Sequence, residues 1–119
     1  MADDVKIGDG DVPITIDGQE LVLKPSYKAA LALSRSEGLV LLSSRCQSLD
    51  VDAMTKVVAE GLGRNPSDLG ERIYKSGLTN VREACVLFIA ALANGGRLPR
   101  AVQEAKESPL AIAEEKTGT

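Results

Sequence analysis

The chain has 119 residues, of which 44% are hydrophobic and only 3% aromatic, and its formal net charge is −3. This length favours one domain with an aliphatic core, and the composition excludes collagen-like, disulfide-framework and wholly disordered classes. The absence of histidine excludes histidine-based catalysis and histidine metal ligands, and the acidic balance disfavours general nucleic-acid binding, which needs cations to neutralise phosphates.

The two ends of the chain are expected to lie outside the packed domain. Residues 1–11 are rich in Asp and Gly and contain no apolar signal region, so we expect a flexible acidic arm. Residues 12–96 are expected to form a single helical domain, and residues 97–119 a C-terminal helix with a frayed tail. The longest apolar run, Ala84–Ala93, is too short to cross a bilayer. We therefore expect a soluble protein that is not secreted and has no membrane partner.

The strongest local pattern is a β-hairpin. The apolar runs Val12–Ile16 and Gln19–Leu23 flank Asp17-Gly18, a dipeptide that favours a two-residue type I′ turn because both positions need a positive φ. This turn predicts the following cross-strand pairs: Ile16 with Gln19, Thr15 with Glu20, Ile14 with Leu21, Pro13 with Val22, and Val12 with Leu23. One face then carries most of the apolar side chains and must dock on the rest of the protein.

Helical spacing and capping signals predict helices for the rest of the chain. The first two expected helices run from Pro25 to a stop at Gly38 and over Leu39–Leu49. The next two are one that follows the N-cap Asp50 and ends at Gly61–Gly63, and one over Pro66–Ser76 after the N-cap Asn65. The last two are a core helix over Val81–Asn94, capped by Thr79 or Asn80, and a helix over Arg97–Ser108. The predicted fold is mainly α: an N-terminal β-hairpin followed by a compact bundle of about five short helices, or α+β by strict count.

No catalytic, cofactor or metal site is predicted. Cys46 and Cys85 form no CxxC or zinc pattern and are expected to be reduced and buried. The serines lack a histidine to activate them. Asp50 and Asp52 lie at a helix start, where capping and the helix dipole account for them. We therefore expect a protein that is not an enzyme and has no cofactor.

One segment has a superficial likeness to a DNA-binding motif. Residues 51–77 contain a helix, a glycine turn and a second helix, with Arg64, Arg72 and Lys75 nearby. Asp68 and Glu71 lie on the would-be recognition helix and would repel phosphates. DNA binding is therefore the weaker hypothesis.

Two surfaces are candidates for binding another protein. The hairpin leaves the backbone groups of Glu20 and Val22 on an outward strand edge, and an open edge is a template for another chain. The second candidate follows the core helix and consists of the apolar residues Leu98, Val102, Leu110 and Ile112.

The order of these elements resembles a known family. The hairpin over Ile14–Leu23 leads into a helix at Pro25–Ala32, followed by the apolar segments Gly38–Leu42 and Met54–Leu62, a short helix and the closing apolar helix Val86–Ala93. This order is similar to that of the small tail assembly chaperones of long-tailed phages, especially the gene transfer agent branch. The resemblance covers residues 12–96 and includes no catalytic signature.

The resemblance implies a non-enzymatic role in the cytoplasm of a bacterial host cell. Such proteins hold the tape-measure protein while the tail tube polymerises around it, so the implied partners are the tape-measure protein and the tail tube protein, with a possible homo-oligomer. Two alternatives stay open: a small helix-turn-helix regulator that binds DNA, and an adaptor subunit of a larger complex.

Overall fold

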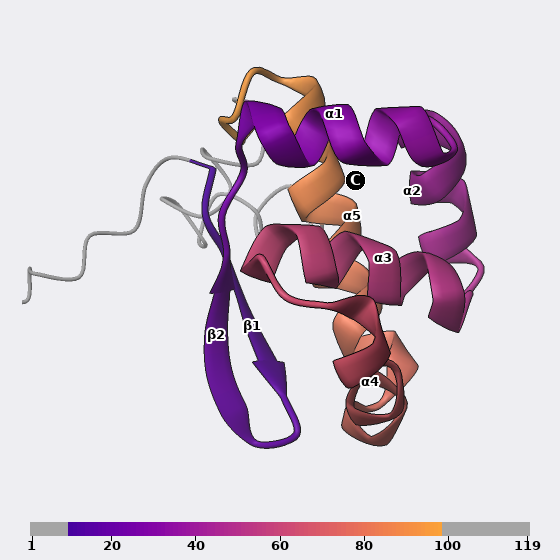
Figure 1. The fold of residues 1–119 in the computed structure, drawn as a ribbon. Helices are drawn as coiled ribbons and strands as arrows, with labels where there is room; N and C mark the ends of the chain where they lie inside the picture. The colour runs from indigo at the N-terminus through magenta and orange to yellow at the C-terminus, as the bar shows by residue number, and fades with distance from the viewer. Residues whose placement is uncertain (1–9, 99–119) are drawn as a thin grey trace, which may run out of the picture.

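The computed structural model describes residues 10–98, which form an antiparallel β-hairpin followed by five α-helices and one short 3-10 helix (Figure 1). In chain order the elements are β1 (Val12–Ile16), β2 (Gln19–Leu23), α1 (Tyr27–Ser36), α2 (Leu39–Gln47), α3 (Val51–Leu62), the 3-10 helix η1 (Pro66–Asp68), α4 (Gly70–Ser76) and α5 (Leu78–Ala93). This confirms the predicted fold class, mainly α with an N-terminal hairpin.

The hairpin has the predicted register at all five pairs, from Ile16 opposite Gln19 to Val12 opposite Leu23. Asp17 and Gly18 have φ values of 55° and 81°, so both turn residues adopt the positive φ that a type I′ turn requires. Along β1, buried and exposed residues alternate strictly. The local turn chemistry therefore sets which face of the hairpin enters the core.

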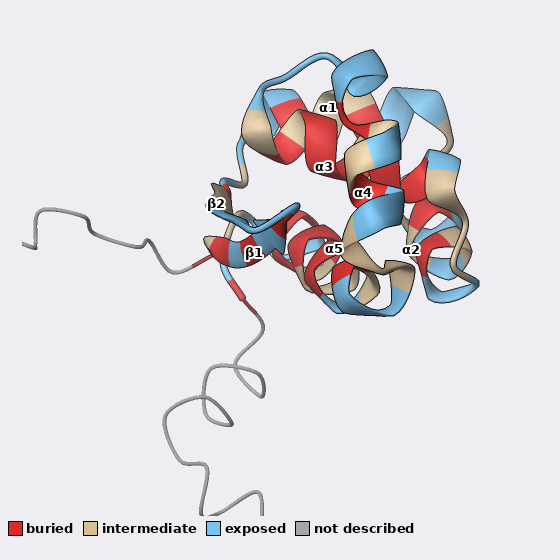
Figure 2. Cartoon of the chain, turned by 90° about the horizontal axis from the view of Figure 1, so that it is seen from below, coloured by how far each residue is buried: buried red, intermediate tan, exposed pale blue. Residues whose placement is uncertain are grey.

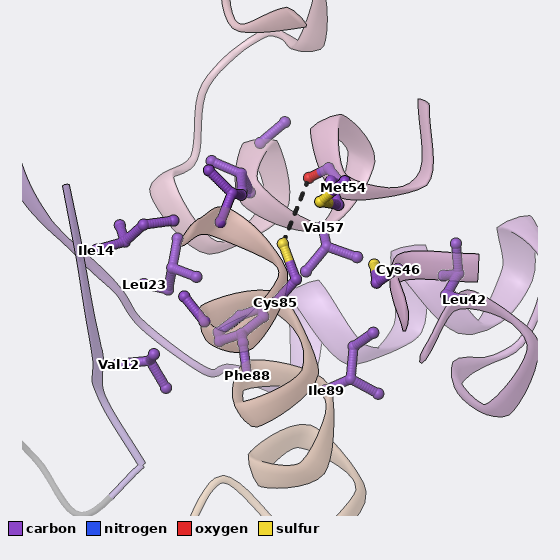
Figure 3. Packing of buried hydrophobic residues seen from close by; sticks show 14 of the residues in the cluster. Val12, Ile14, Leu23, Leu42, Cys46, Met54, Val57, Cys85, Phe88 and Ile89 are labelled. Atoms are coloured by element: carbon purple, nitrogen blue, oxygen red, sulfur yellow. Dashed lines mark hydrogen bonds between the residues drawn. The ribbon is translucent and has the colours of Figure 1, made fainter. Parts of the chain in front are cut away.

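The core is organised around α5, which contacts β1 and each of the other four α-helices. Its inward side chains include Cys85, Phe88 and Ile89, which lie between the hairpin and the helices α2 and α3 (Figure 3). Phe88 is fully buried and is the only phenylalanine in the chain. The rest of the core is mostly aliphatic, as the composition predicts, with the sulfur-containing side chains Cys46, Met54 and Cys85 among them.

The hairpin, α3 and α5 meet at Gly61. A Cβ atom at this position would lie 2.9 Å from Leu23 Cδ2 and 3.2 Å from Phe88 Cζ, closer than ordinary van der Waals contact allows. In addition, the Lys24 N–H donates a hydrogen bond of 3.0 Å to the Gly61 carbonyl. Gly61 is therefore required for the close approach of α3 to β2, and it does not merely end the helix.

Two helix boundaries before α3 differ from the prediction. The first helix begins after Ser26, whose Oγ accepts a hydrogen bond from the Ala29 N–H at 3.0 Å, so Pro25 precedes the cap and does not lie in the first turn. The second helix ends at Gln47, because Leu49 adopts a φ of 64°. Asp50 caps α3 through the Ala53 N–H, as predicted.

The segment after α3 also differs. Asn65 caps η1 as predicted, but Pro66–Ser76 is not one helix, because η1 ends at Asp68 and α4 starts at Gly70. The core helix begins at Leu78, directly after Gly77, without a side-chain cap. The proposed caps Thr79 and Asn80 are therefore wrong. The amide of Asn80 donates instead to the Ser76 carbonyl and covers the end of α4.

Both predicted domain boundaries are displaced. Gly10 was placed in the flexible arm, but it is buried, and a Cβ atom there would overlap the backbone of Gly96. Leu98 was placed beyond the domain, yet its side chain is only 4% exposed and belongs to the core. The packed body therefore extends at least over residues 10–98. The predicted helix Arg97–Ser108 lies mostly outside the described residues, although residues 97 and 98 are not helical.

The register makes a prediction about stability. Ile14 is buried against the helices, whereas its neighbour Thr15 is exposed on the opposite face. Ile14→Asp should lower the free energy of unfolding by roughly 2–4 kcal/mol through lost apolar burial and an unpaired carboxylate. Thr15→Asp is the matched control and should cost much less. Chemical denaturation measures both, and equal losses would contradict the assignment of faces.

Candidate functional site

Both ends of the hairpin are attached to the helices. At the turn, the Asp17 N–H donates to Ser76 Oγ at 2.7 Å, and Arg72 Nε lies 3.7 Å from Asp17 Oδ2. At the other end, the hydrogen bond from Lys24 to Gly61 joins β2 to α3. The middle of β2 lies between these two attachments. They fix the position of the strand, but neither of them covers its middle.

The middle of β2 presents an open strand edge. In a hairpin with a two-residue turn, hydrogen-bonded and non-hydrogen-bonded pairs alternate outward from the turn. Glu20 and Val22 fall in non-hydrogen-bonded pairs, so their N–H and C=O groups point away from β1. Among residues 10–98, no hydrogen bond reaches these groups. Lys24, the next outward position along this edge, is the one that bonds to Gly61.

The two strands differ in how they are covered. β1 packs against α4 and α5, and its outward positions include Pro13, which has no N–H to offer. β2 has exposed residues at Gln19 and Glu20 and half-buried residues at Leu21 and Val22. Figure 2 shows this contrast, with red bands on β1 and mostly blue and tan on β2. The accessible edge of the sheet is therefore that of β2.

An open groove lies between the hairpin and α5 and encloses about 750 Å³. Glu20 and Val22, both predicted from the sequence, contribute to its lining. The opposite wall is a stripe along two turns of α5. In full, the lining residues are Val12, Pro13, Ile14, Thr15, Glu20, Leu21, Val22, Asn80, Glu83, Ala84 and Leu87. Most of these residues are apolar, so the groove offers hydrophobic surface between the hairpin and α5, on the side where β1 contacts that helix.

The groove has an unbalanced charge. Glu20 and Glu83 are both exposed carboxylates, and no lysine or arginine is among the lining residues. Neither carboxylate forms an ion pair within residues 10–98. A ligand that brings a cation to this surface would therefore meet uncompensated negative charge.

The other predicted partner residues do not join this surface. Leu98 is buried, which corrects the expectation that it is available to a partner. Val102, Leu110 and Ile112 lie outside the described residues. Sequence reasoning also missed four large apolar side chains that are exposed on α1, α2 and α4, namely Tyr27, Val40, Leu41 and Tyr74.

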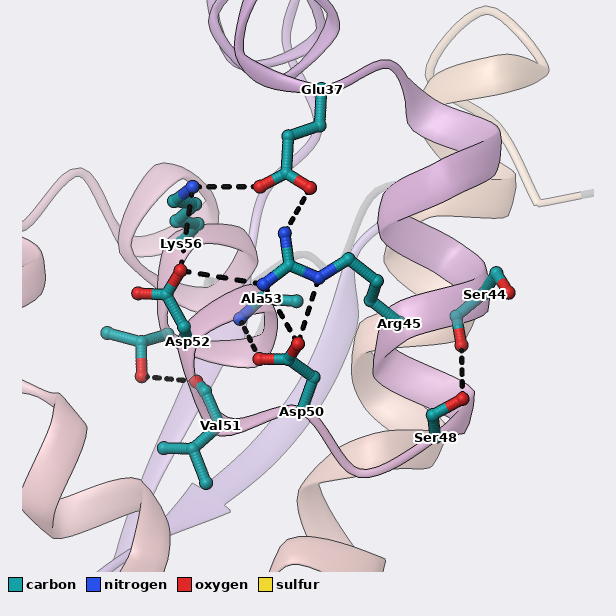
Figure 4. A network of polar contacts seen from close by, with 10 residues as sticks. Glu37, Ser44, Arg45, Ser48, Asp50, Val51, Asp52, Ala53 and Lys56 are labelled. Carbon is teal, nitrogen blue, oxygen red and sulfur yellow. Dashed lines mark hydrogen bonds and ion pairs between the residues drawn. The ribbon is translucent and has the colours of Figure 1, made fainter.

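The densest polar cluster joins α1, α2 and α3 (Figure 4). Arg45 on α2 lies at its centre, donating to Asp50 Oδ2 at 2.9 Å through Nε and also pairing with Glu37. Lys56 on α3 donates to Glu37 Oε2 at 2.8 Å, and Asp52 lies within 3.7 Å of both cations. Every carboxylate here has a cationic partner. The cluster therefore clamps three helices together and has no free group for acid–base chemistry.

The ion pairs shift the protonation of this cluster. Hydrogen bonds from Lys56 and Arg45 lower the pKa of Glu37, and the Ala53 N–H together with Arg45 lowers the pKa of Asp50. The same contacts raise the pKa of Arg45 and of Lys56. Both carboxylates therefore stay ionised well into the acid range.

The two cysteines are buried and free, as predicted. The Cys85 thiol hydrogen-bonds with Cys46, and this contact together with burial raises the pKa of Cys85. Its Sγ also lies 3.9 Å from the Met54 carbonyl (Figure 3). A thiol held protonated in an apolar core is a packing residue and a poor nucleophile.

Two of the three cations near the helix-turn-helix-like segment are already occupied. Arg72 contacts Asp17 and donates to Gln19 Oε1 at 3.0 Å. Lys75 lies 3.4 Å from Glu71 on its own helix. These contacts reduce the positive charge that α4 could offer to phosphates.

Residues 10–98 contain no group of three or more Cys, Asp or Glu side chains arranged to hold a metal ion. None of the helices in this region is long and apolar enough by itself to cross a membrane; α4 and α5 meet the length and composition criteria only as a pair bent by 113°. Comparison of the chain with protein-family models, curated proteins and solved structures finds no match.

The polar cluster predicts an acid-dependent loss of stability. Because the pKa values of Glu37 and Asp50 are lowered by folding, their stabilising contribution is present above about pH 4 and is lost as the pH falls through those lowered values. Arg45→Met should therefore unfold more easily than the wild type at pH 7, and the difference should shrink below about pH 4. Denaturant unfolding across pH 2–7 measures it.

Arg35 provides the matched control. It is exposed on α1 and has no ion pair within the described chain. Arg35→Met should shift stability little and by a similar amount at all pH values. If Arg45→Met followed this same flat profile, the cluster would not contribute to the stability of the fold.

Proposed function

We propose that this chain is a non-enzymatic tail assembly chaperone of a phage or gene transfer agent, which holds the tape-measure protein while the tail tube assembles. The observation that carries the proposal is the open edge of β2 at Glu20 and Val22, which is fixed at both ends and whose two residues also contribute to the lining of an apolar groove. Such a surface suits the temporary covering of apolar or strand-forming segments of another chain. The resemblance in the order of the elements supports the same role.

The proposed mechanism is competition for the client. The chaperone covers segments of the tape-measure protein that would otherwise associate prematurely, because binding lowers the concentration of the free segment. Tail tube subunits then displace it by binding the same segments. Since this mechanism needs no bond to be made or broken, it requires neither a catalytic residue nor a cofactor. We place it in the cytoplasm of the bacterial host.

The test is co-expression of the full chain with the tape-measure protein from the same gene cluster. We expect the soluble yield of the tape-measure protein to rise several-fold and the two proteins to co-purify. Co-expression with an unrelated aggregation-prone protein is the control for a general solubilising effect. Equal solubility of the tape-measure protein with and without the chain would reject the proposal, and equal rescue of the unrelated protein would favour an unspecific adaptor.

A second measurement separates the chaperone from a DNA-binding regulator. The net charge is −3, and Arg72 and Lys75 of α4 are paired with acidic or amide side chains. Duplex DNA should therefore bind no better than non-specifically, with a Kd above roughly 10⁻⁴ M at physiological salt. Sequence-selective retention at micromolar concentration in a gel-shift assay would support the regulator instead.

A further inference from the structure

We propose that the edge of β2 binds its client as a third, antiparallel strand, with a lysine or arginine of the client placed beside Glu20. This inference rests on the proposed function for the identity of the client. It adds the backbone geometry and the side-chain chemistry by which the client is recognised.

The first argument is the supply of backbone hydrogen bonds. Glu20 and Val22 present two N–H and two C=O groups on one edge, and within residues 10–98 none of the four has a partner. The N–H of Lys24, the next outward group on this edge, already donates a hydrogen bond to a carbonyl outside the sheet, that of Gly61. An added strand repeats this interaction at the two open positions.

The second argument is side-chain exposure. Leu21 points toward the core face, yet it is only half-buried, whereas its cross-strand neighbour Ile14 is buried. The difference arises because β1 packs against α4 and α5, which do not cover the far side of β2 to the same extent. An apolar side chain on an added strand would cover this surface.

The third argument is charge. Glu20 lies on the opposite face from Leu21, is exposed, and forms no ion pair in the part of the chain that the structure describes. A residue directly opposite it on an antiparallel neighbour lies about 5 Å away between Cβ atoms, where a cation is favourable and an acid is unfavourable. The bound segment therefore places an apolar residue beside Leu21 on one face and a cation opposite Glu20 on the other.

The opposite edge of the sheet does not offer the same site. Its outward positions are Pro13 and Thr15, and Pro13 has no N–H to donate. β1 also contacts α4 and α5, whereas the helix contacts of β2 are with α3, at the end of the strand where Lys24 bonds to Gly61. Strand addition is therefore directed to β2.

The probe is a fluorescent seven-residue peptide in which valine alternates with lysine, titrated into the full chain. Two N-methylated versions distinguish strand pairing from other contacts. Methylation at the lysines removes the N–H groups that would face Glu20 and Val22, and should weaken binding at least tenfold. Methylation at the valines removes N–H groups on the edge of the peptide that faces away from β2, and should leave the affinity within about twofold. Equal loss in both peptides, or in neither, would overturn strand addition.

Variants of the protein test the same contact from the other side. Val22→Pro deletes one outward N–H without breaking the ladder, because Val22 is in a non-hydrogen-bonded pair. It should weaken peptide binding about tenfold, whereas Val22→Thr, which keeps the N–H, should not. Circular dichroism verifies the fold of each.

Charge reversal keeps the test decisive if Val22→Pro fails to fold. Glu20 is exposed, so Glu20→Lys should fold normally. It should bind the valine–lysine peptide more weakly than the wild type does, and a valine–glutamate peptide more tightly. If both proteins had the same preference between the peptides, the assignment of a cation beside Glu20 would be wrong.

The outcomes separate this inference from the proposed function. If the wild type and Val22→Pro raise the soluble yield of the tape-measure protein equally, the chaperone proposal is supported and strand addition is wrong. If the peptide binds as expected but the tape-measure protein is not rescued, strand addition stands and the chaperone proposal falls. If the wild type is a dimer that Val22→Pro converts to a monomer, the edge is occupied by a second copy and the proposed client is wrong.

Discussion

The fold depends on the absence of a side chain at Gly61. Here α3 comes close enough to the hairpin and to α5 that a Cβ atom would overlap Leu23 and crowd Phe88. The same residue accepts the Lys24 N–H, so one position supplies both the steric gap and a hydrogen bond across the junction. Because a two-stranded hairpin is marginal by itself in water, docking at Gly61 converts it into a stable part of the protein.

This docking also determines what the hairpin can do. With its turn attached to α4 and its base attached to α3, β2 is held in an extended conformation before any ligand arrives. A partner that pairs with Glu20 and Val22 then orders only its own backbone, which reduces the entropic cost of binding. A free hairpin with the same sequence would have to order both chains and would bind less well.

Local signals in the sequence were enough for the hairpin but not for the junctions. Asp17-Gly18 sets the register because turn geometry acts over a few residues, and Asp50 and Asn65 are caps for the same reason. Contacts between distant residues leave no such pattern. The sequence alone therefore predicts a helix stop at Gly61 and a partner residue at Leu98, whereas Gly61 permits a close approach between elements and Leu98 is buried. The groove is a middle case, because the edge residues Glu20 and Val22 follow from the turn and the strand pattern, whereas the α5 wall depends on tertiary contacts.

An open strand edge normally invites self-association, and the composition of this hairpin restricts it. Pro13 removes a donor from the edge of β1. On the edge of β2, Glu20 would face another Glu20 or a neighbouring residue of an identical strand, and like charges directly opposite each other are unfavourable. A second copy that pairs Glu20 with Glu20 is therefore disfavoured, whereas a cationic strand gains from the same carboxylate. The carboxylate that disfavours this self-pairing register also favours a cationic foreign strand, so one residue contributes to both solubility and specificity.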